Sequence, residues 1–258
     1  MAEHQTTQPA LAGKQKSLAG KKVLITGGTT GIGREIARKL AQEGAMVMIF
    51  GRDESAMNEA LESLLESATD GDPIGFTADV ATEDGIRKIF SEVDAQGGID
   101  VLVNNAALGY QGILSGNYEE WQYILNVNVL GYLACTHEAA KRMAAAGTKG
   151  HIVYIGSMSA DTREAKSSVY VATKSGIQGF AEAARKELNP KGIRVSLIEP
   201  GAVDTDMQEQ PSDEKRQQIE EEKMLMAEDI ADAVHFVLTR PERCDVVEMK
   251  IRPKQQLI

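Results

Sequence analysis

The sequence predicts an α/β fold, a three-layer sandwich in which a doubly wound parallel sheet of about seven strands lies between helices on both faces. Short β-rich runs alternate with longer segments whose apolar residues recur every three to four positions, and this alternation predicts right-handed crossovers and a parallel sheet. The run MVMIF is apolar at every position, which fits burial between two helix layers. A chain of 258 residues with 42% apolar content can form one core of this kind.

The elements follow one another regularly along the chain. Strands are predicted at 22–26 (KVLIT), 46–50 (MVMIF), 74–78 (IGFTA), 100–104 (DVLVN), 151–155 (HIVYI), 193–199 (IRVSLIE) and 246–251 (VVEMKI). Helical patterns are predicted at 32–44, 54–67, 82–96, 118–146 and 169–189, with a solvated acidic helix at 212–223. No repeat or Pro-rich linker divides the chain, so we expect a flexible tail over residues 1–18 and a single domain over residues 19–258.

The composition excludes several classes of partner. A net charge of -10 and a pI near 5.0 disfavour nucleic acid and anionic membranes, since both require a basic face. No apolar stretch approaches the ~18 residues that span a bilayer, and the polar start lacks the apolar core of a signal peptide. Cys135, Cys244 and the four histidines match no metal-ligand spacing. We therefore expect a cytoplasmic protein with reduced thiols and no metal.

The stretch TGGTTGIG, from Thr26 to Gly33, joins the first predicted strand to the first predicted helix. A glycine-rich turn in this position lets the backbone approach a bound pyrophosphate, whose charge is stabilised by free N–H groups and by the positive end of the helix dipole. Glycines also serve any tight turn. Because this turn follows a buried strand and opens an amphipathic helix, the sequence favours a dinucleotide site over a merely structural turn.

A second group of polar residues lies after the predicted strand at 151–155. Tyr170 and Lys174 are four residues apart on a predicted helix, which places both on one face. Ser157 comes just past the strand, thirteen residues before Tyr170. We expect the three side chains to converge on one cleft. Reduction of a ketone by hydride leaves charge on oxygen, and such a reaction requires an acid that protonates the oxygen as the hydride arrives.

These motifs resemble the short-chain dehydrogenase/reductase family, and the resemblance extends from about Lys21 to the C-terminus. The glycines at 27, 31 and 33 form T-G-x-x-x-G-I-G, and Y-x-x-x-K follows at 170–174. Further family motifs occur in order: Asp79-Val80, N-N-A-A at 104–107 in place of N-N-A-G, NVNVLG at 126–131, and Pro200-Gly201. Ala107 replaces the usual glycine, which slightly crowds the backbone near the cofactor without removing a catalytic group.

The resemblance implies a Rossmann-like fold and hydride transfer between NADP(H) and a carbonyl or secondary alcohol. It makes Tyr170 the general acid/base, while Ser157 holds the substrate oxygen and Asn128 supports a water relay. Lowering the pKa of a tyrosine from ~10 by about three units takes roughly 4 kcal/mol, to be supplied by Lys174 and the oxidised nicotinamide. The residues implied in cofactor binding are Gly27, Thr29, Thr30, Gly31, Ile32, Gly33, Arg52, Asp79, Val80, Asn105, Ala106, Tyr170, Lys174, Pro200, Gly201, Val203 and Thr205.

The nicotinamide preference depends on the segment GRD at 51–53. A site for NAD places a carboxylate just past the second strand, and counting ~20 residues from the glycine turn nominates Asp53. The predicted strand ends at Phe50, however, so Gly51 is the first residue beyond it and leaves room for a 2′-phosphate. Arg52 follows, and its guanidinium can donate two hydrogen bonds to that phosphate. Glycine followed by arginine resembles the NADP-dependent members of the family, so we expect NADP(H). A surface ion pair of Arg52 with Asp53 or Glu54 is the alternative.

The substrate and the assembly are less well defined by the sequence. Substrate contacts are expected at 108–112, 158–164 and 201–227, where Met207, Met224 and Met226 are candidate lining residues and core filling is the alternative for them. The tail at 246–258 lacks a glycine-rich ending and resembles hydroxy-acid dehydrogenases more than ketoacyl reductases, but both stay open. A nonenzymatic NADP-binding sensor or scaffold is the alternative from another class. The family packs paired helices across a dimer axis, which implies a homo-oligomer, a dimer or tetramer, formed through 121–146 and 169–188.

Overall fold

The computed structural model describes residues 17–110, 112–205, 207 and 210–256. It contains a sheet of seven strands, all parallel, in the order β3-β2-β1-β4-β5-β6-β7. The strands are β1 (Lys22–Thr26), β2 (Met46–Gly51), β3 (Ile74–Thr77), β4 (Val101–Asn104), β5 (His151–Ile155), β6 (Arg194–Pro200) and β7 (Glu248–Ile251). The predicted doubly wound sheet is confirmed, and the chain reverses its direction of travel across the sheet between β1 and β4.

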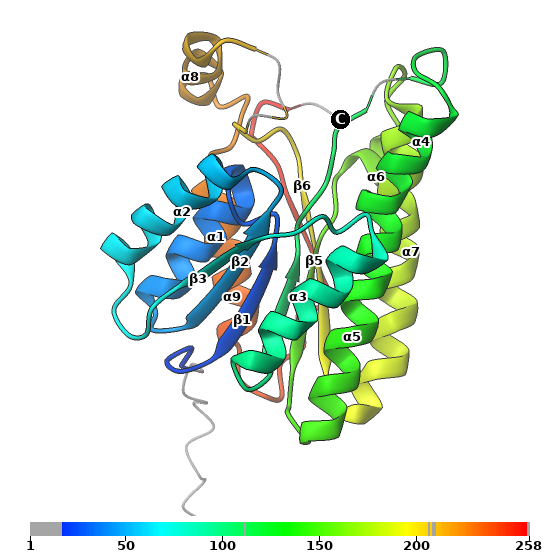
Figure 1. The fold of residues 1–258 in the computed structure, drawn as a ribbon. Helices are drawn as coiled ribbons and strands as arrows, with labels where there is room; N and C mark the ends of the chain where they lie inside the picture. Colours follow the sequence, from blue (N-terminus) through cyan, green and yellow to red (C-terminus); the bar gives the residue numbers. More distant parts are fainter. Residues whose placement is uncertain (1–16, 111, 206, 208–209, 257–258) are drawn as a thin grey trace, which may run out of the picture.

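Helices cover both faces of the sheet, as Figure 1 shows. The helices α1, α2 and α9 lie on one face, and α3, α5 and α7 lie on the other. The helical elements are α1 (Gly31–Gln42), α2 (Glu54–Ser67), α3 (Glu83–Ala95), α4 (Tyr118–Leu125), the π-turn η1 (Asn126–Leu130), α5 (Gly131–Ala146), α6 (Ser159–Thr162), α7 (Ser168–Leu188), the 3₁₀ turn η2 (Asn189–Lys191), α8 (Ser212–Glu220) and α9 (Ala227–Thr239).

Side-chain caps fix where several of these helices begin. The Asp53 carboxylate accepts a hydrogen bond from the amide of Ala56 at the start of α2, and the Thr82 hydroxyl does the same for Gly85 at the start of α3. Asn117 caps α4 through the amides of Glu119 and Glu120. Each cap pairs an amide that the first turn of a helix leaves without an intrahelical partner.

Two helical predictions differ from the structure. The pattern at 118–146 predicted one helix, but the structure divides it at η1, where Asn128 is turned inward and buried. Periodicity over long windows does not resolve a single π-turn, since the apolar pattern continues on both sides. The helix α9 was missing from the predicted elements. It is apolar around most of its circumference, because it packs against both α1 and β6.

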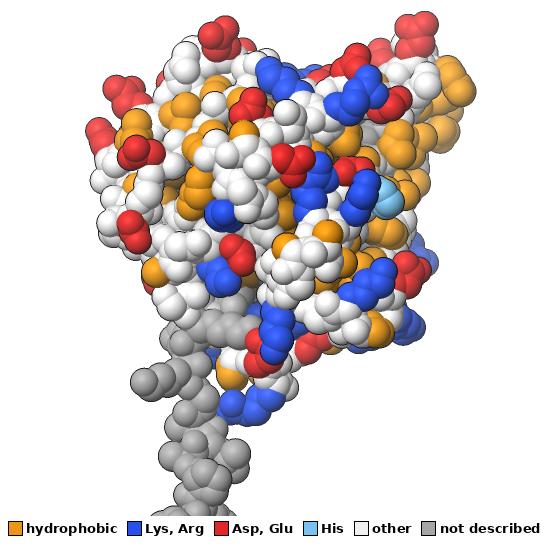
Figure 2. Space-filling view, turned by 60° about the horizontal axis from the view of Figure 1, so that its bottom comes forward, with side chains coloured by type: hydrophobic (Ala, Val, Ile, Leu, Met, Phe, Trp, Pro, Cys, Tyr) orange, Lys and Arg blue, Asp and Glu red, His pale blue; other side chains and the backbone are white. Residues whose placement is uncertain are grey.

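The core fills the space between the sheet and the two helix layers. Strand residues such as Leu24, Ile49 and Val153 are completely buried. Residues 1–16 of the predicted tail lie outside the described residues. Leu18, which we assigned to that tail, is only 5% exposed and belongs to the core, so packing begins there. On the face drawn in Figure 2, Lys and Arg side chains are interspersed with Asp and Glu and form no continuous basic surface.

Among the described residues, no helix is both long and apolar enough to cross a membrane. Both cysteines are free thiols. Cys135 is buried, and burial raises the pKa of its thiol to about 12, which makes it unreactive at neutral pH. In the part of the chain that the structure describes, no cluster of three or more His, Cys, Asp or Glu side chains is arranged to hold a metal ion.

Candidate active site

A cleft of about 1490 Å³ opens at the carboxyl ends of the strands, where the chain reverses direction between β1 and β4. Most of the residues predicted from the sequence line it: Gly27, Thr29, Thr30, Gly31, Ile32, Arg52, Asp79, Val80, Asn105, Ala106, Ser157, Tyr170, Lys174, Pro200, Gly201, Val203 and Thr205. Gly33 and Asn128 are buried behind this lining. The fold thus brings residues from seven separate segments of the chain to one site.

The glycine turn is shaped by close contacts that leave no room for side chains. Gly27 has a φ of 63°, in the left-handed region, and a Cβ there would lie 2.9 Å from the Cα of Ala106. A Cβ on Gly33 would lie 2.1 Å from the carbonyl oxygen of Gly27. Gly33 therefore lets the first turn of α1 pack against the loop, and its place behind the lining shows a packing role rather than exposure to the cleft.

Thr26 and Asn105 bind the glycine turn to the end of β4. The buried hydroxyl of Thr26 accepts hydrogen bonds from the amides of Asn105 and Ala106, both at 2.8 Å. The Asn105 side chain donates in return to the carbonyl oxygens of Thr26 and Gly27, both at 3.0 Å. These bonds satisfy backbone groups that would otherwise be buried without partners, and they hold the two strand ends in register. The sequence had indicated Asn105 but not the role of Thr26.

The segment Gly51–Asp53 lies at the far end of the cleft. A Cβ on Gly51 would approach the Thr29 side chain to 2.7 Å, so Thr29 occupies the space that a carboxylate at position 51 requires. Asp53 is engaged as the cap of α2, with its Oδ1 2.8 Å from the amide of Ala56. Arg52 is exposed and lines the cleft. The geometry favours Arg52 over Asp53 as the side chain that meets the ribose end of a dinucleotide.

Arg52 is held by Tyr123, a residue that the sequence gave no reason to single out. The guanidinium Nη1 donates to the Tyr123 hydroxyl at 2.5 Å, and this hydroxyl donates to the Asp79 carboxylate at 3.0 Å. The guanidinium carbon also lies 5.6 Å from the centre of the Tyr123 ring, within range of a cation–π contact. Tyr123 comes from α4, far from both partners in sequence. Only the tertiary structure therefore shows that two of the predicted cofactor-binding residues, Arg52 and Asp79, bind the same tyrosine hydroxyl.

The serine and tyrosine meet at the opposite end of the cleft. The backbone amide of Ser159, at the start of α6, donates to the Ser157 Oγ at 3.1 Å and orients that hydroxyl. Burial raises the pKa of Tyr170, and a hydrogen bond with Ser157 opposes this rise. The lowering of the tyrosine pKa that we expect from Lys174 and the oxidised nicotinamide therefore has to overcome this effect of burial. The physical reason is that the phenol is desolvated, and removing water disfavours the phenolate.

Lys174 lies one turn along α7 from Tyr170 and is almost completely buried. Its Nζ donates to the carbonyl oxygen of Ile155 at 2.9 Å and lies 5.7 Å from the centre of the Tyr170 ring. Burial lowers the pKa of Lys174 to about 8, and the charge of Glu199 acts in the opposite direction. The pKa of this lysine thus lies closer to neutral pH than that of an exposed lysine.

Asn128 is completely buried in η1 and supports the loop after β4. Its Oδ1 accepts from the amide of Leu108 at 2.8 Å, and its Nδ2 donates to the Leu108 carbonyl oxygen at 2.9 Å. The Nδ2 also donates to the Thr173 hydroxyl at 3.2 Å, next to Lys174 in sequence. In the described residues Asn128 therefore satisfies backbone groups, and the water relay that the family resemblance implies stays a prediction.

The expected substrate side of the cleft mixes apolar and polar groups. Tyr110, Met158 and Met207 line it, and Met207 is 45% exposed. The predicted acidic helix is present as α8, at the top of Figure 1. Met224 and Met226, the other methionines of this region, do not line the cleft. Residues 111, 206 and 208–209, which fall within the predicted substrate loops, lie outside the described residues.

Comparisons with known proteins agree with this geometry. A family model described as short chain dehydrogenase matches residues 21–216. An uncharacterised oxidoreductase of Staphylococcus epidermidis is 35% identical over 90% of this chain and 97% of its own. The dehydrogenase/reductase SDR family member 11 of Homo sapiens is 33% identical over 91% of this chain and 94% of its own.

Two solved structures of related proteins contain a nicotinamide cofactor. A metagenomic short-chain oxidoreductase in complex with NADP has a TM-score of 0.79 at 29% identity, covering 93% of this chain and 100% of its own. The L-sorbose reductase of Gluconobacter frateurii, complexed with NADPH and L-sorbose, has a TM-score of 0.83 at 26% identity, covering 94% of this chain and 99% of its own.

The sheet order, the glycine turn at the reversal point and the serine, tyrosine and lysine at one end of the cleft define an oxidoreductase of the Rossmann class. Within that class, the chain belongs to the short-chain dehydrogenase/reductase family. The family predicted from the motifs is confirmed, and membership favours the enzyme over the sensor or scaffold.

Proposed function

We propose that this protein transfers a hydride between NADP(H) and a carbonyl compound or secondary alcohol, with Tyr170 as general acid/base. The observation that carries the proposal is the convergence of Ser157, Tyr170 and Lys174 at one end of a cleft whose other end presents Arg52. This arrangement separates a proton-donating end from a phosphate-binding end, as a nicotinamide dinucleotide requires.

The residues present fit such a cofactor. The left-handed glycines and the start of α1 form a cradle that a side chain on Gly27 would fill, and a pyrophosphate would be held there by backbone amides. Asp79 would meet the adenine and Arg52 the 2′-phosphate. When bound, the cofactor supplies or accepts the hydride. The protein's own contribution is to position the substrate and to move a proton.

In the reducing direction, Tyr170 donates its phenolic proton to the substrate oxygen, which Ser157 holds in place. The same phenol accepts the proton in the oxidising direction. Since burial raises the pKa of Tyr170, the phenolate needs a positive charge nearby, and the Lys174 ammonium is placed to supply it. We retain Asn128 as a support of this site, acting through Leu108 and Thr173.

The proposed function is tested by nicotinamide oxidation and reduction with a panel of ketones, ketoacids, hydroxy acids and sugar alcohols, using both cofactors. The panel includes a sugar because the solved reductase with L-sorbose resembles this chain. We expect turnover with at least one carbonyl or alcohol. If the protein binds NADP(H) but no member of the panel is turned over, the sensor or scaffold alternative gains support.

We predict at least a tenfold preference for NADP(H), which Arg52→Ala should largely abolish with little change toward NAD(H). A charge-assisted contact with phosphate contributes about 1.5–3 kcal/mol, and a tenfold preference corresponds to about 1.4 kcal/mol. The measurement is kcat/KM for both cofactors in the two proteins. Arg52 already lies in the cleft with its guanidinium held by Tyr123, which favours this role.

Asp53→Ala is the matched control for this prediction. It removes the cap of α2 and should destabilise the protein by about 1 kcal/mol, because the Ala56 amide loses its partner. The cofactor preference should not change. Equal efficiency with NAD(H) in the unmodified protein, or a preference that follows Asp53 rather than Arg52, would contradict the assignment.

We also propose that the protein forms a homo-oligomer, a dimer or tetramer, through α4–α5 and α7. Leu125, Leu130 and Leu133 are 46%, 54% and 36% exposed along the first of these faces. On α7, a Cβ at Gly176 or Gly179 would meet nothing within 4 Å, so another helix has room to approach. We expect light scattering at micromolar concentration to give a multiple of 27.9 kDa. A monomeric mass would contradict the proposal.

The cytoplasm is the location that we propose. The two cysteines are free, and Cys135 is enclosed in the core, as expected where thiols stay reduced.

A further inference from the structure

A buried carboxylate lies behind the serine, tyrosine and lysine of the site. Glu199, on β6, is completely buried, although a glutamate side chain is ordinarily ionised at neutral pH. Within the described residues its Oε1 has no hydrogen-bond partner. Burial of a carboxylate without full hydrogen bonding is costly, so the group requires a functional or structural explanation. The hydride-transfer scheme does not use Glu199, and neither the sequence motifs nor the cleft lining includes it.

The position of Glu199 links it to the backbone of the site. A Cβ on Gly156 would lie 3.0 Å from the Glu199 Cγ and 3.3 Å from its Oε1. Gly156 immediately precedes Ser157, and Lys174 binds the carbonyl oxygen of the residue before it, Ile155. The carboxylate is therefore packed against the short segment that carries the serine and receives the lysine.

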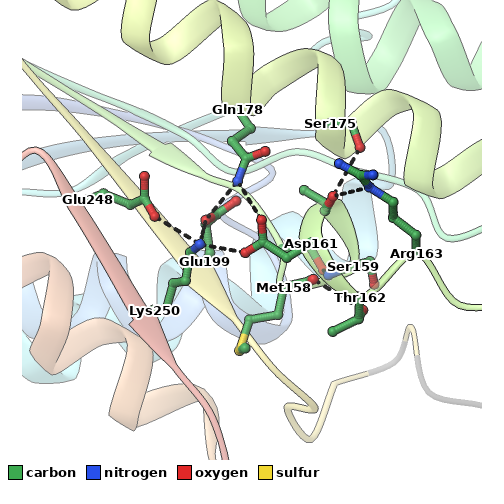
Figure 3. A network of polar contacts seen from close by, with 12 residues as sticks. Met158, Ser159, Asp161, Thr162, Arg163, Ser175, Gln178, Glu199, Glu248 and Lys250 are labelled. Carbon is green, nitrogen blue, oxygen red and sulfur yellow. Dashed lines mark hydrogen bonds and ion pairs between the residues drawn. The ribbon is translucent and has the colours of Figure 1, made fainter. Parts of the chain in front are cut away.

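The helix α7 makes a second connection. Tyr170, Lys174 and Gln178 follow one another at intervals of four, so they lie on one face of the helix. Figure 3 shows Gln178 directed at both Glu199 and Asp161. Its Nε2 is 3.5 Å from the Glu199 Oε2 and donates to the Asp161 Oδ1 at 3.0 Å. The helix face that carries the proposed catalytic pair thus continues to the carboxylate.

Lys250 connects Glu199 to the surface. Its ammonium lies 2.5 Å from Asp161, 3.0 Å from Glu248 and 3.7 Å from the Glu199 Oε2, and its side chain is 38% exposed (Figure 3). The charged groups around Glu199 are therefore Asp161 on α6 and Glu248 and Lys250 on β7. Lys174 on α7 binds Ile155, the residue next to the Gly156 against which Glu199 packs, and the charge of Glu199 acts on the pKa of this lysine.

We propose that Glu199 is a positioning residue for the reaction: its carboxylate keeps the Lys174 ammonium charged, and Lys250 in turn keeps Glu199 ionised. The proposal rests on the proposed function of the Ser157, Tyr170 and Lys174 group. It assigns a role to a buried acid that does not itself contact the substrate.

The titration properties of the groups agree with this geometry. Burial raises the pKa of Glu199 to about 7, with Lys250 opposing the rise and Glu248 and Asp161 adding to it. Burial lowers the pKa of Lys174 to about 8, and the Glu199 charge acts against that fall. The anion whose charge raises the Tyr170 pKa is a different residue, Glu164, so the charge of Glu199 acts on the lysine rather than on the phenol.

Loss of the Glu199 charge should shift the pH dependence of alcohol oxidation in one direction. Removing the Glu199 charge lowers the pKa of Lys174 further, so a larger fraction of the lysine is neutral at neutral pH. A neutral lysine no longer stabilises the Tyr170 phenolate. The pH at which alcohol oxidation reaches half of its maximal kcat should therefore rise.

The kinetic test compares the pH dependence of kcat for alcohol oxidation in the unmodified protein and in Glu199→Gln. We expect the midpoint to rise by about one pH unit, so that kcat falls on the acidic side of the midpoint. Glu199→Asp retains the charge and should keep the original midpoint. A Glu199→Gln protein with an unchanged midpoint would overturn the proposal.

Lys250→Met provides a second, pH-dependent comparison. Without the ammonium, the pKa of Glu199 rises further, so this variant should resemble Glu199→Gln near pH 7 and approach the unmodified protein near pH 9. Lys254→Met is the matched control, because it removes one lysine of the same terminal segment, paired with Glu222 at 2.9 Å. It should leave the profile unchanged. A shift of equal size in both lysine variants would mean that general surface charge explains the effect.

A double-mutant cycle tests the Glu199–Lys174 coupling without any activity. The unfolding free energies of the unmodified protein, Glu199→Gln, Lys174→Met and the double variant are measured in denaturant near pH 7.5. Glu199→Gln should be less destabilising when Lys174 is absent, since the carboxylate has then lost its cation. Additive changes would overturn the proposal. If the unmodified protein turns over no substrate, the proposed function fails, while the cycle still decides whether the two charges are coupled.

Discussion

Tyr170→Phe is expected to reduce turnover by two orders of magnitude or more while leaving the fold and the affinity for NADP(H) nearly unchanged. The substitution removes one hydroxyl from a half-buried ring and keeps the ring's packing. Loss of a positioned general acid typically reduces the rate 10²–10⁴-fold. The relevant measurement is kcat in both reaction directions, with cofactor affinity followed by the quenching of protein fluorescence.

The control for this prediction is Tyr110→Phe. Tyr110 also lines the cleft, and its hydroxyl donates to the exposed Glu120 at 2.6 Å. We expect Tyr110→Phe to change KM more than kcat. Near-normal turnover of Tyr170→Phe would exclude Tyr170 as the acid, and an equal loss in both variants would point to general disturbance of the cleft.

Lys174→Met is expected to lower both turnover and cofactor affinity, each by at least tenfold, without loss of stability. Its ammonium is held in an apolar environment that lowers its pKa to about 8, so the folded state binds this proton less well than the unfolded chain. The unmodified protein should therefore gain stability as the pH rises from about 8 toward the unfolded value near 10.4. Lys174→Met should lack this gain.

The methionine substitution is chosen because it fills most of the lysine's volume. The Ile155 carbonyl oxygen that Lys174 binds also accepts the Tyr132 hydroxyl at 3.1 Å, so it keeps a partner in the variant. Activity and stability are then separable, by steady-state kinetics and by denaturant titration at two pH values. Unchanged kcat and unchanged cofactor affinity would remove Lys174 from the site.

The sheet could be predicted from the sequence because each strand is a short apolar run bounded by polar or glycine residues. The seven predicted strands differ from the observed ones by two residues or fewer at each end, as in β2, which extends one residue further to Gly51. The site residues could be placed because parallel strands end at one edge, which brings the segments after β1, β2, β4, β5 and β6 together.

The remaining features depend on contacts between distant segments. Tyr123 lies on α4 in an ordinary helical pattern, and nothing in its local sequence indicates that it meets Arg52 and Asp79. Glu199 stands in an apolar strand as a single acidic residue, and only the packing of α7 and β7 shows what surrounds it. Side-chain periodicity reports one face of one element, whereas these contacts join three elements at once.

The π-turn η1 constrains how the chain between β4 and β5 can change in length. A turn of this type holds one residue more than a turn of α-helix, and the wide turn absorbs this residue while the helix continues on both sides. Deleting one residue from Asn126–Leu130 would restore regular helix but would remove the wide turn that presents Asn128 to Leu108. Insertions and deletions should therefore be accepted in the surface loops of this protein and rejected inside this helix.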